Sequence, residues 1–464
     1  MARSDDPRRR LPAVDALTRD NALQEAAAAL SAETVAACVR EALSVARAAV
    51  AAGEAAPSRQ QLVQEVLRRL SPLRAPTIRR VINATGIILH TGLGRAPLAA
   101  EAAEAVREAC GYCTLEFDLE SGERGERQAH VEELLCRLSG AEAALTVNNN
   151  AAALYLTLNA LGYRREVVVS RGQLIEIGGS FRLPDIMARS GAKMVEVGTT
   201  NRTRLSDYRS AITPKTALLL HCHTSNYRIV GFTESVAIDK LVKLGRERGI
   251  PVADDIGNGL LWDWSSLGLP SEVNARSSLE AGADLVLMSG DKALGGPQAG
   301  IILGRRSLVE VLRKNPLARV LRPEKLMLAG LSATLRLHLD WRRVAERVPV
   351  WRMLTCPLPV LRERAGRLRE CLAPLAVWQV LEVRESEAET GSGTLPAVTI
   401  PSAALCTLPQ GWSAAKWAQR LRVADVPVVG SVREDVLWLD MRTISEEDED
   451  DLVRSVERVL REGP

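Results

Sequence analysis

From about residue 80, short apolar runs alternate with stretches of helical character, and this alternation restricts the possible folds more than any other feature. Each run is continuously apolar, which is typical of strands buried on both faces of a sheet. Strands separated by helices favour parallel pairing, because a helix returns the chain to the starting end of the sheet. We therefore expect an α/β domain with a mostly parallel sheet. The predicted strands are Ala143–Val147, Val167–Ser170, Met194–Val197, Ala217–Leu220, Pro251–Ala253, Leu285–Met288 and Ile301–Leu303.

Two smaller regions flank this domain. The first 72 residues contain an alanine-rich stretch, Ala22–Ala52, and an amphipathic one, Ser58–Leu70, which together predict a helical domain. It contains ten arginines and nine carboxylates, so its near-zero net charge favours a packing or assembly role over RNA binding. The C-terminal region predicts a small α+β domain with strands at Ala397–Ile400 and Val436–Asp440. The expected division is a helical domain at 1–72, a linker at 73–98, the α/β core at 99–350 and the small domain at 351–464.

Composition excludes several classes of protein. The 464 residues are 46% hydrophobic and 25% charged, as in soluble globular proteins, and the net charge of +3 does not indicate a nucleic-acid partner by itself. No apolar segment reaches the roughly 18–20 residues that span a bilayer, and the N-terminus lacks the apolar core of a secretory signal. Eight scattered cysteines fit a reducing compartment. We expect a cytoplasmic protein with no membrane or DNA partner.

Lys292 is the strongest single candidate for chemistry. Only eight of the 60 basic residues are lysines, and Lys292 lies in LVLMSGDKALGGPQAGIILG, a glycine-rich turn between two apolar strands. Desolvation in such a turn lowers an amine pKa and favours Schiff-base formation. Taken alone, the same string also fits a lysine in a surface loop.

Two further stretches supply the partners that pyridoxal phosphate requires. Asp254 and Asp255 end a strand in PVADDIGNG, where a carboxylate can keep a pyridine nitrogen protonated. Asn148–Asn150 end another strand and precede a helix, whose free amides form an anion site. Each stretch alone also fits a cap or a turn. The order phosphate turn, aspartate and lysine suggests a pyridoxal-phosphate enzyme of the aspartate-aminotransferase-like fold type I.

The chain also resembles the bacterial selenocysteine synthase family, the L-seryl-tRNA(Sec) selenium transferases. The resemblance extends from RRRLPAVDAL (8–17) to VPVVGSVREDVLWLDMRTI (426–444) and therefore covers nearly the whole chain. Its most specific strings lie at 80–98, 115–153, 223–233, 254–259, 289–300 and 316–326. The chain departs from the family pattern at two places: it has DDIGNG in place of DDLGSG, and Cys113 where serine is expected. Cys113 and Cys110 form a lone C-x-x-C, which we interpret as two packed free cysteines.

The resemblance implies roles for individual residues. Lys292 would form the internal aldimine and Asp291 would be catalytic, while Asp254, with Asp255 as the alternative, would contact the pyridinium nitrogen. The cofactor phosphate would lie at the turn of Asn149, Asn150 and Ala151, and Ser289 would line the cofactor site. The anionic selenium donor would bind arginines, whose forked donors suit a phosphate-like group. These arginines are Arg95, Arg319 and Arg322.

The resemblance further implies the reaction and the assembly. Seryl-tRNA(Sec) would lose water to give aminoacrylyl-tRNA, which would accept selenium from selenophosphate to form selenocysteinyl-tRNA(Sec). The N-terminal helical domain would bind the tRNA, and the protein would form a homodecamer, a pentamer of dimers. The pair His221 and His223 predicts no metal site by itself, and we expect one of them to line the cofactor pocket or to pack.

Two rival functions remain open from the sequence. Shorter relatives of this core are pyridoxal-phosphate-dependent ammonia lyases that act on small phosphorylated sugar acids. The N-terminal helical extension and the SGERGERQAHVEE stretch favour the transferase over them. A catalytically silent tRNA-binding protein is the second rival, and the intact lysine, aspartate and asparagine set argues against it.

Overall fold

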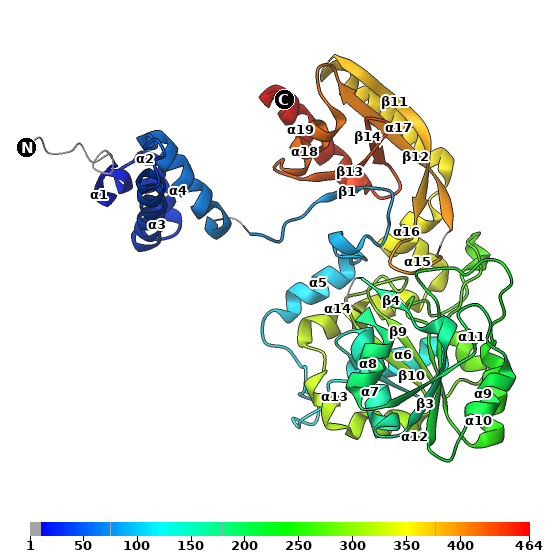
Figure 1. Ribbon diagram of the computed structural model, residues 1–464. Coiled ribbons are helices and arrows are strands. Elements are labelled where there is room, and N and C mark those ends of the chain that lie inside the picture. Colours follow the sequence, from blue (N-terminus) through cyan, green and yellow to red (C-terminus); the bar gives the residue numbers. More distant parts are fainter. Residues whose placement is uncertain (1–10, 75, 179–180, 376, 397) are drawn as a thin grey trace, which may run out of the picture. The chain divides into compact units, whose positions relative to one another are not determined.

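The computed structural model describes residues 11–74, 76–178, 181–375, 377–396 and 398–464 (Figure 1). The chain divides into two compact units, Met1–Arg80 and Val81–Pro464. The boundary falls within the segment 73–98 that we expected to be a linker. The part of that segment after Arg80 belongs to the larger unit and contributes a strand to it.

The N-terminal unit is helical, as expected. Its helices are α1 (Val14–Thr18), α2 (Asn21–Ala29), α3 (Ala32–Ala51) and α4 (Arg59–Arg74). Their apolar faces enclose a core that includes Leu23, Leu43 and Leu70. The single helical stretch expected over Ala22–Ala52 is wrong in one respect, because Ser31 divides it. The Ser31 hydroxyl accepts a hydrogen bond from the backbone N–H of Thr34 at 3.1 Å, which ends one helix and begins the next.

A seven-stranded sheet forms the centre of the larger unit, in the order β2-β10-β9-β8-β7-β3-β6. All neighbouring strands pair in parallel except β10, which is antiparallel to both β2 and β9. All seven strands predicted from the sequence are present, so the mostly parallel α/β core is confirmed. They are β2 (Ala143–Val147), β3 (Glu166–Ser170), β6 (Lys193–Val197), β7 (Thr216–Cys222), β8 (Val252–Asp255), β9 (Leu285–Ser289) and β10 (Gly300–Gly304).

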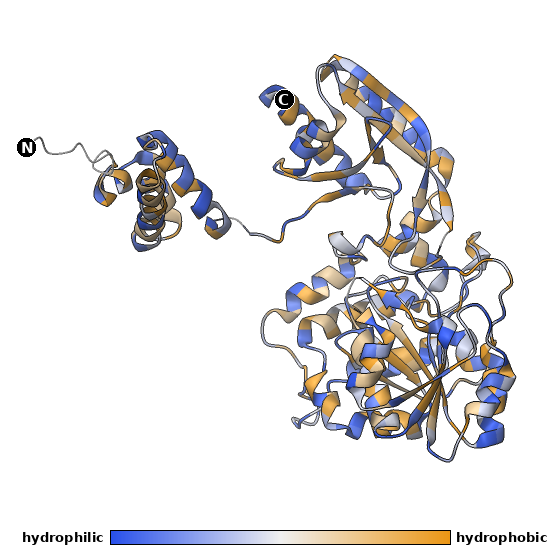
Figure 2. Ribbon diagram, in the orientation of Figure 1, coloured by the Kyte–Doolittle hydropathy of each residue, from blue (hydrophilic) through white to orange (hydrophobic). Residues whose placement is uncertain are grey.

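The strands of this sheet are coloured as hydrophobic along most of their length in Figure 2, and their side chains pack in buried clusters on both faces. Along β9, Val286 and Met288 pack in one buried cluster, and Leu285 and Leu287 pack in the other. Successive side chains of a strand point to opposite faces, so helices must cover both. The helices of this domain are α5 (Ala100–Ala109), α6 (Ala129–Ser139), α7 (Asn150–Gly162), α8 (Leu183–Ser190), α9 (Leu205–Ala211), α10 (Ile238–Arg248), α11 (Ala275–Glu280), α12 (Arg306–Lys314), α13 (Pro316–Val320), α14 (Lys325–His338), α15 (Val344–Arg347) and α16 (Pro349–Thr355). A short hairpin pairs β4 (Glu176–Ile177) with β5 (Phe181–Arg182).

The C-terminal part contains a five-stranded sheet in the order β1-β13-β14-β12-β11. Its first strand comes from the segment after Arg80, and its helices pack against an apolar core that includes Trp417 and Leu405. The expected strand Val436–Asp440 is confirmed. Of the expected strand Ala397–Ile400, residue 397 lies outside the described residues, and β12 begins at Thr399. The elements are β1 (Ile82–Ala84), β11 (Trp378–Glu389), β12 (Thr399–Pro409), β13 (Val428–Arg433), β14 (Val436–Asp440), α17 (Leu358–Leu372), α18 (Ala414–Arg422) and α19 (Glu449–Glu462).

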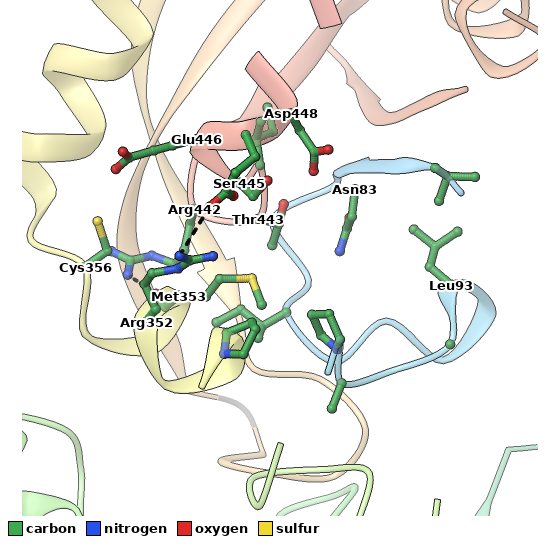
Figure 3. Close-up of a pocket in the computed structure, with 18 of the residues that line it drawn as sticks. Asn83, Leu93, Arg352, Met353, Cys356, Arg442, Thr443, Ser445, Glu446 and Asp448 are labelled. Carbon is green, nitrogen blue, oxygen red and sulfur yellow. Dashed lines mark hydrogen bonds and ion pairs between the residues drawn. The ribbon is translucent and has the colours of Figure 1, made fainter. Parts of the chain in front are cut away.

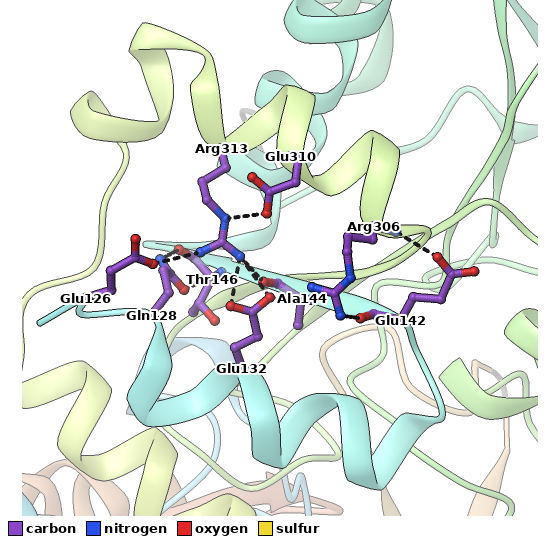
Figure 4. Close-up of polar contacts among 9 residues, drawn as sticks. All are labelled: Glu126, Gln128, Glu132, Glu142, Ala144, Thr146, Arg306, Glu310 and Arg313. Carbon is purple, nitrogen blue, oxygen red and sulfur yellow. Dashed lines mark hydrogen bonds and ion pairs between the residues drawn. The ribbon is translucent and has the colours of Figure 1, made fainter.

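Side chains complete the hydrogen bonding of β2, the edge strand of the large sheet (Figure 4). The Gln128 amide donates to the carbonyl of Thr146 at 2.8 Å and accepts from its N–H at 3.0 Å, as a neighbouring strand would. Glu132 accepts from the N–H of Ala144 and binds Arg313 at 2.8 Å. An edge strand paired in this way presents fewer free groups to another chain, and its end is held in place. That end leads directly into Asn148–Asn150.

Two further expectations are tested here. Cys110 and Cys113 are free, as expected, but both are exposed, so the expectation that they pack is wrong. They lie at the end of α5 and in the segment that follows it, outside the apolar cores. No helix of the described residues is both long enough and apolar enough to cross a membrane.

Candidate active site

The predicted site residues gather at the carboxyl ends of the central strands. Asp254 and Asp255 end β8, Ser289 ends β9, and Asn149 follows β2. Lys292 and Asp291 lie in the turn after β9. The carboxyl edge of an open parallel sheet is where α/β proteins bind ligands, so the topology brings together residues that are far apart in sequence.

Lys292 is buried, with 5% of its surface exposed. The pKa of its amine is lowered from about 10.5 to about 8, mainly by burial and also by the charge of Arg95, while Asp291 and Asp255 oppose the shift. An amine with this pKa is uncharged in about a tenth of molecules at pH 7, several hundred times more often than an ordinary lysine. The structure therefore prepares Lys292 to act as a nucleophile and as a base.

Asp291 forms a partly buried ion pair beside Lys292. The Arg95 Nη1 lies 2.6 Å from Asp291 Oδ2, and the backbone N–H of Ala96 donates to the Asp291 carbonyl at 3.4 Å. Arg95 has a φ of +64°, a left-handed conformation that strains any residue with a β-carbon. Such strain persists only where the surrounding contacts hold it, and here the backbone N–H of Arg95 donates to the His90 carbonyl at 3.0 Å while its side chain binds the Asp291 carboxylate.

Asp254 is fully buried and has two hydrogen-bonding partners. His221 Nδ1 lies 2.7 Å from Oδ1, and the Ser278 hydroxyl donates to Oδ2 at 2.6 Å. His221, the penultimate residue of β7, lies opposite Asp254 in the parallel register, while Ser278 comes from α11. Both oxygens of Asp254 therefore have partners within the fold.

Asp255 points to the other side of β8, as adjacent residues of a strand must. Asn150 Nδ2 donates to its Oδ1 at 2.9 Å, which links this carboxylate to the start of α7. Burial raises the pKa of Asp255 to about 6, against the Asn150 hydrogen bond and the charge of Lys292. A β-carbon added to Gly257 would lie 3.8 Å from Asp255 Oδ1 and 4.0 Å from Asn150 Nδ2, which is ordinary van der Waals distance from both. Asp255, not Asp254, thus shares its surroundings with Lys292 and the α7 terminus.

The start of α7 has the features of an anion site. The Asn149 side chain caps the helix by accepting from the Ala152 N–H at 2.9 Å. The amides of Asn150 and Ala151 belong to the first turn, where no carbonyl of the helix can accept from them. The 13-residue helix directs the positive end of its dipole to the same point. Ser289 is buried at the adjacent end of β9.

Arg319 and Arg322 lie apart from this cluster within one chain. Among the described residues, no hydrogen bond or ion pair connects either of them to Lys292 or Asp291. Arg322 Nη1 lies 3.8 Å from Glu116, which also pairs with Arg127 at 2.6 Å. The backbone beside Arg322 does reach the anion site, since the Leu321 carbonyl accepts from the Asn148 N–H at 3.0 Å.

Two cavities adjoin the cluster. The first, of about 360 Å³, is lined by Arg95, Arg352, Arg442 and neighbouring residues of the small domain (Figure 3). Since Arg95 also binds Asp291, it lies between this cavity and the lysine turn. The second, of about 430 Å³, is lined by His221 and His223, with His223 Nε2 2.8 Å from Glu272. Both histidines thus line a cavity, and the expectation that one of them lines the cofactor pocket or packs stays a prediction.

Sequence reasoning missed several functional contacts. Ser278 and Glu272 belong to no motif that the sequence shows. Each lies far along the chain from the residue that it contacts, Asp254 for Ser278 and His223 for Glu272. His221 was noticed, but its pairing with Asp254 became visible only through the β7–β8 register. The alternation of side chains along a strand was the one available signal that Asp254 and Asp255 have different surroundings.

Comparison with known proteins decides the family. A sequence profile described as L-seryl-tRNA selenium transferase matches residues 81–445, and one described as selenocysteine synthase N terminal matches residues 8–47. The L-seryl-tRNA(Sec) selenium transferase of Carboxydothermus hydrogenoformans is 45% identical over 455 residues, covering 97% of each chain. The chain belongs to the L-seryl-tRNA selenium transferase family. The resemblance stated from the sequence is thereby confirmed.

Other members are similarly close. The L-seryl-tRNA(Sec) selenium transferase of Caldanaerobacter subterraneus subsp. tengcongensis is 43% identical, covering 98% of this chain and 99% of its own length. That of Aquifex aeolicus is 46% identical and covers 86% of this chain and 87% of its own. Family membership thus includes the N-terminal helical unit, which distinguishes this chain from a bare α/β core.

A solved structure supports the fold. A D-glucosaminate-6-phosphate ammonia-lyase aligns with a TM-score of 0.57 at 21% identity, over 86% of this chain and 98% of its own. At that identity the likeness concerns the fold alone. The expected fold class is confirmed: a fold type I α/β domain with a small C-terminal domain and a helical N-terminus.

The charges around Lys292 predict how its titration responds to mutation. Arg95→Gln removes a cation and leaves Asp291 unpaired, so the Lys292 pKa should rise by about one unit; Asp291→Asn should lower it by a similar amount. Competitive acetylation of the apoprotein at a series of pH values, read by mass spectrometry, measures the midpoint. Arg305→Gln, which breaks the ion pair with Asp284, is the matched control and should leave the midpoint unchanged. Shifts of the opposite sign would contradict the charge arrangement.

Proposed function

We propose that this chain is an L-seryl-tRNA(Sec) selenium transferase that uses pyridoxal 5′-phosphate and selenophosphate to convert seryl-tRNA(Sec) into selenocysteinyl-tRNA(Sec). The observation that carries the proposal is the buried Lys292 amine with a pKa lowered to about 8, beside Asp291 and Asp255. Curated relatives with this activity in their names share 43–46% of their residues with nearly the whole chain.

The residues of the site fit pyridoxal phosphate. Its aldehyde requires an uncharged amine, which Lys292 supplies; its phosphate requires free backbone amides, which Asn150 and Ala151 supply with Ser289 nearby. Asn150 Oδ1 is buried without a hydrogen-bonding partner among the described residues, so the site contains a polar atom that a ligand or water would satisfy. The cofactor, when bound to Lys292, supplies an electron sink for the substrate α-carbon.

The chain's own residues perform the proton transfers. Lys292 is uncharged often enough at neutral pH to accept the α-proton of the seryl group. Loss of the seryl hydroxyl as water needs a proton donor, and Asp291 or the protonated Lys292 would supply that proton. Arg95 holds the Asp291 carboxylate at 2.6 Å and so fixes where that group points.

The contacts of the two aspartates favour Asp255 as the partner of the pyridine nitrogen. Asp254 already has His221 and Ser278 on its two oxygens. Asp255 is buried with a raised pKa, so a nearby cation would stabilise its charged form. This order is the reverse of the one that the sequence suggested, where Asp254 came first.

The selenium donor is an anion, and we assign it to Arg95, Arg319 and Arg322. Arg95 already adjoins Asp291. Among the described residues, neither Arg319 nor Arg322 makes a hydrogen bond or ion pair with Lys292, and we assign both to an interface in a homodecamer built from dimers. The Glu116 contact at 3.8 Å would then orient Arg322 toward that interface.

The tRNA supplies most of the substrate binding. The seryl carboxyl is esterified, so no carboxylate clamp is needed. We assign tRNA binding to the N-terminal unit, which forms a separate compact body and which matches the selenocysteine synthase N-terminal profile.

Action in the cytoplasm is supported by the eight cysteines, all of which are free.

Replacing Lys292 tests the function directly. Lys292→Ala should abolish the absorbance of lysine-bound cofactor and all selenocysteinyl-tRNA(Sec), measured after incubation with charged tRNA and selenophosphate. Lys240→Ala removes an exposed lysine of α10 and should change neither. Turnover retained in Lys292→Ala would overturn the assignment, and an ammonia product from a phosphorylated sugar acid would favour the lyase instead.

The aspartate pair gives a second test. Asp255→Asn should slow selenocysteinyl-tRNA formation on the order of 10²-fold or more, because the ring nitrogen loses the carboxylate that keeps it protonated. Asp254→Asn should have a smaller effect and should act mainly through His221. Steady-state turnover and the pH dependence of the cofactor absorbance measure both. A larger loss in Asp254→Asn would restore the order suggested by the sequence.

Removal of the N-terminal unit tests its role. A chain lacking residues 1–80 should lose tRNA binding in a gel-shift titration but should still bind the cofactor, since the boundary after Arg80 separates two compact units. Cofactor absorbance is the control for folding of the remaining chain. If the shortened chain bound tRNA with unchanged affinity, the larger unit alone would be the binding surface.

A further inference from the structure

The turn that carries Lys292 is tied to the rest of the fold by its backbone. The N–H of Ala293 donates to the Asn258 carbonyl at 3.0 Å, and that of Gly295 donates to the Lys292 carbonyl at 2.9 Å. Neither of these bonds involves the carbonyls of Ala293 and Leu294, the two residues that directly follow the lysine. Both residues are fully buried, so both carbonyls need donors from the protein.

Two aromatic rings supply those donors. The indole Nε1 of Trp351, in α16, donates to the Ala293 carbonyl at 2.7 Å. Nε2 of His338, the last residue of α14, lies 2.8 Å from the Leu294 carbonyl. A carbonyl only accepts, so we assign the histidine proton to Nε2. The rings contact each other edge to face, with centroids 6.0 Å apart.

Burying the polar ring of His338 costs free energy, which its hydrogen bond must offset. Its side chain packs among tryptophans, including Trp262 and Trp351, and burial lowers its pKa to about 4, so the ring is neutral. With the proton on Nε2, Nδ1 remains buried with no partner among the described residues. An unpaired buried nitrogen costs free energy that an apolar side chain would avoid. The compensating feature visible at this position is the bond to Leu294.

We propose that Trp351 and His338 are positioning residues for Lys292, an inference that rests on the proposed role of that lysine. They fix the two carbonyls after it, and so they fix the direction from which its side chain enters the site. Arg95 and Ala96 hold the preceding residue, Asp291, from the other side. A displacement of about 1 Å can cost on the order of 10²-fold in rate, so this clamp bears on catalysis without touching substrate.

The clamp also joins the lysine turn to other parts of the site. Trp351 is followed in α16 by Arg352 and Met353, which line the cavity of Figure 3. His338 ends the helix whose N-terminal side follows Arg322 in the chain. Movement of either helix therefore acts on the backbone next to Lys292.

Trp351→Phe tests the proposal by removing the indole N–H while keeping an aromatic ring. Trp264→Phe is the matched control: Trp264 is equally buried, its ring lies 5.7 Å from that of Trp351, and its Nε1 donates to the Pro270 carbonyl at 2.7 Å, outside the lysine turn. Three measurements are made on the full chain: the acetylation midpoint of Lys292 in the apoprotein, the pH at which the absorbance of bound pyridoxal phosphate titrates, and the steady-state kinetics with seryl-tRNA, which give kcat and KM.

We expect Trp351→Phe to shift both pH values by at least half a unit and to lower kcat about tenfold with KM within twofold. Trp264→Phe should lower the melting temperature comparably and leave all of these quantities unchanged. Equal effects of the two variants on the Lys292 midpoint, or no effect of either, would overturn the positioning role.

His338 provides an independent pair of variants. His338→Gln keeps an N–H donor and should retain the wild-type Lys292 midpoint, whereas His338→Leu should shift it as Trp351→Phe does. This pair decides the question if Trp351→Phe does not fold, and identical midpoints in the two variants would count against the proposal. The acetylation midpoint needs neither cofactor nor turnover. A wild-type chain that makes no selenocysteinyl-tRNA would therefore refute the proposed function without refuting the clamp.

Discussion

The burial of one amine is the constraint on which the rest of the site depends. Lys292 must leave water to become a nucleophile at neutral pH, but a buried ammonium is costly unless carboxylates stand near it. The fold meets both conditions by placing the lysine in a turn just beyond the carboxyl edge of the sheet, with Asp291 beside it and Asp255 opposite. Every other feature of the site either adjusts that balance of charge or holds the amine in place.

The adjacent aspartates show how a strand gives two neighbours different roles. Residues 254 and 255 point to opposite sides of β8, so one carboxylate meets His221 and Ser278 while the other meets Asn150. The first has both of its oxygens hydrogen-bonded within the fold and connects β8 to β7 and α11. The second lies near the lysine and the start of α7. The dipeptide therefore places two carboxylates in different surroundings, one bound by the fold and one facing the proposed site.

The supporting framework is made mostly of side chains that bind backbone. Gln128 completes the edge of the strand that leads to Asn149, and Trp351 and His338 complete the turn that follows Lys292. In each case a side chain takes the place of a missing strand or turn partner. Such contacts fix the backbone next to the proposed site residues without entering the site, and the helices concerned, α6, α14 and α16, all pack in one buried cluster on one face of the sheet.

The strands of the central sheet, the fold class and the family were predictable from the sequence alone, and so was Lys292 as the candidate reactive lysine. Continuous apolar runs and local strings such as SGDKALGG indicate these features within a few residues. The sequence did not determine the break at Ser31, the exposure of Cys110 and Cys113, or the partners of Asp254, Asp255 and Lys292. Those depend on strand register and on which helix end reaches which carbonyl. Such contacts join residues dozens of positions apart, and only the packed chain brings them within hydrogen-bonding distance.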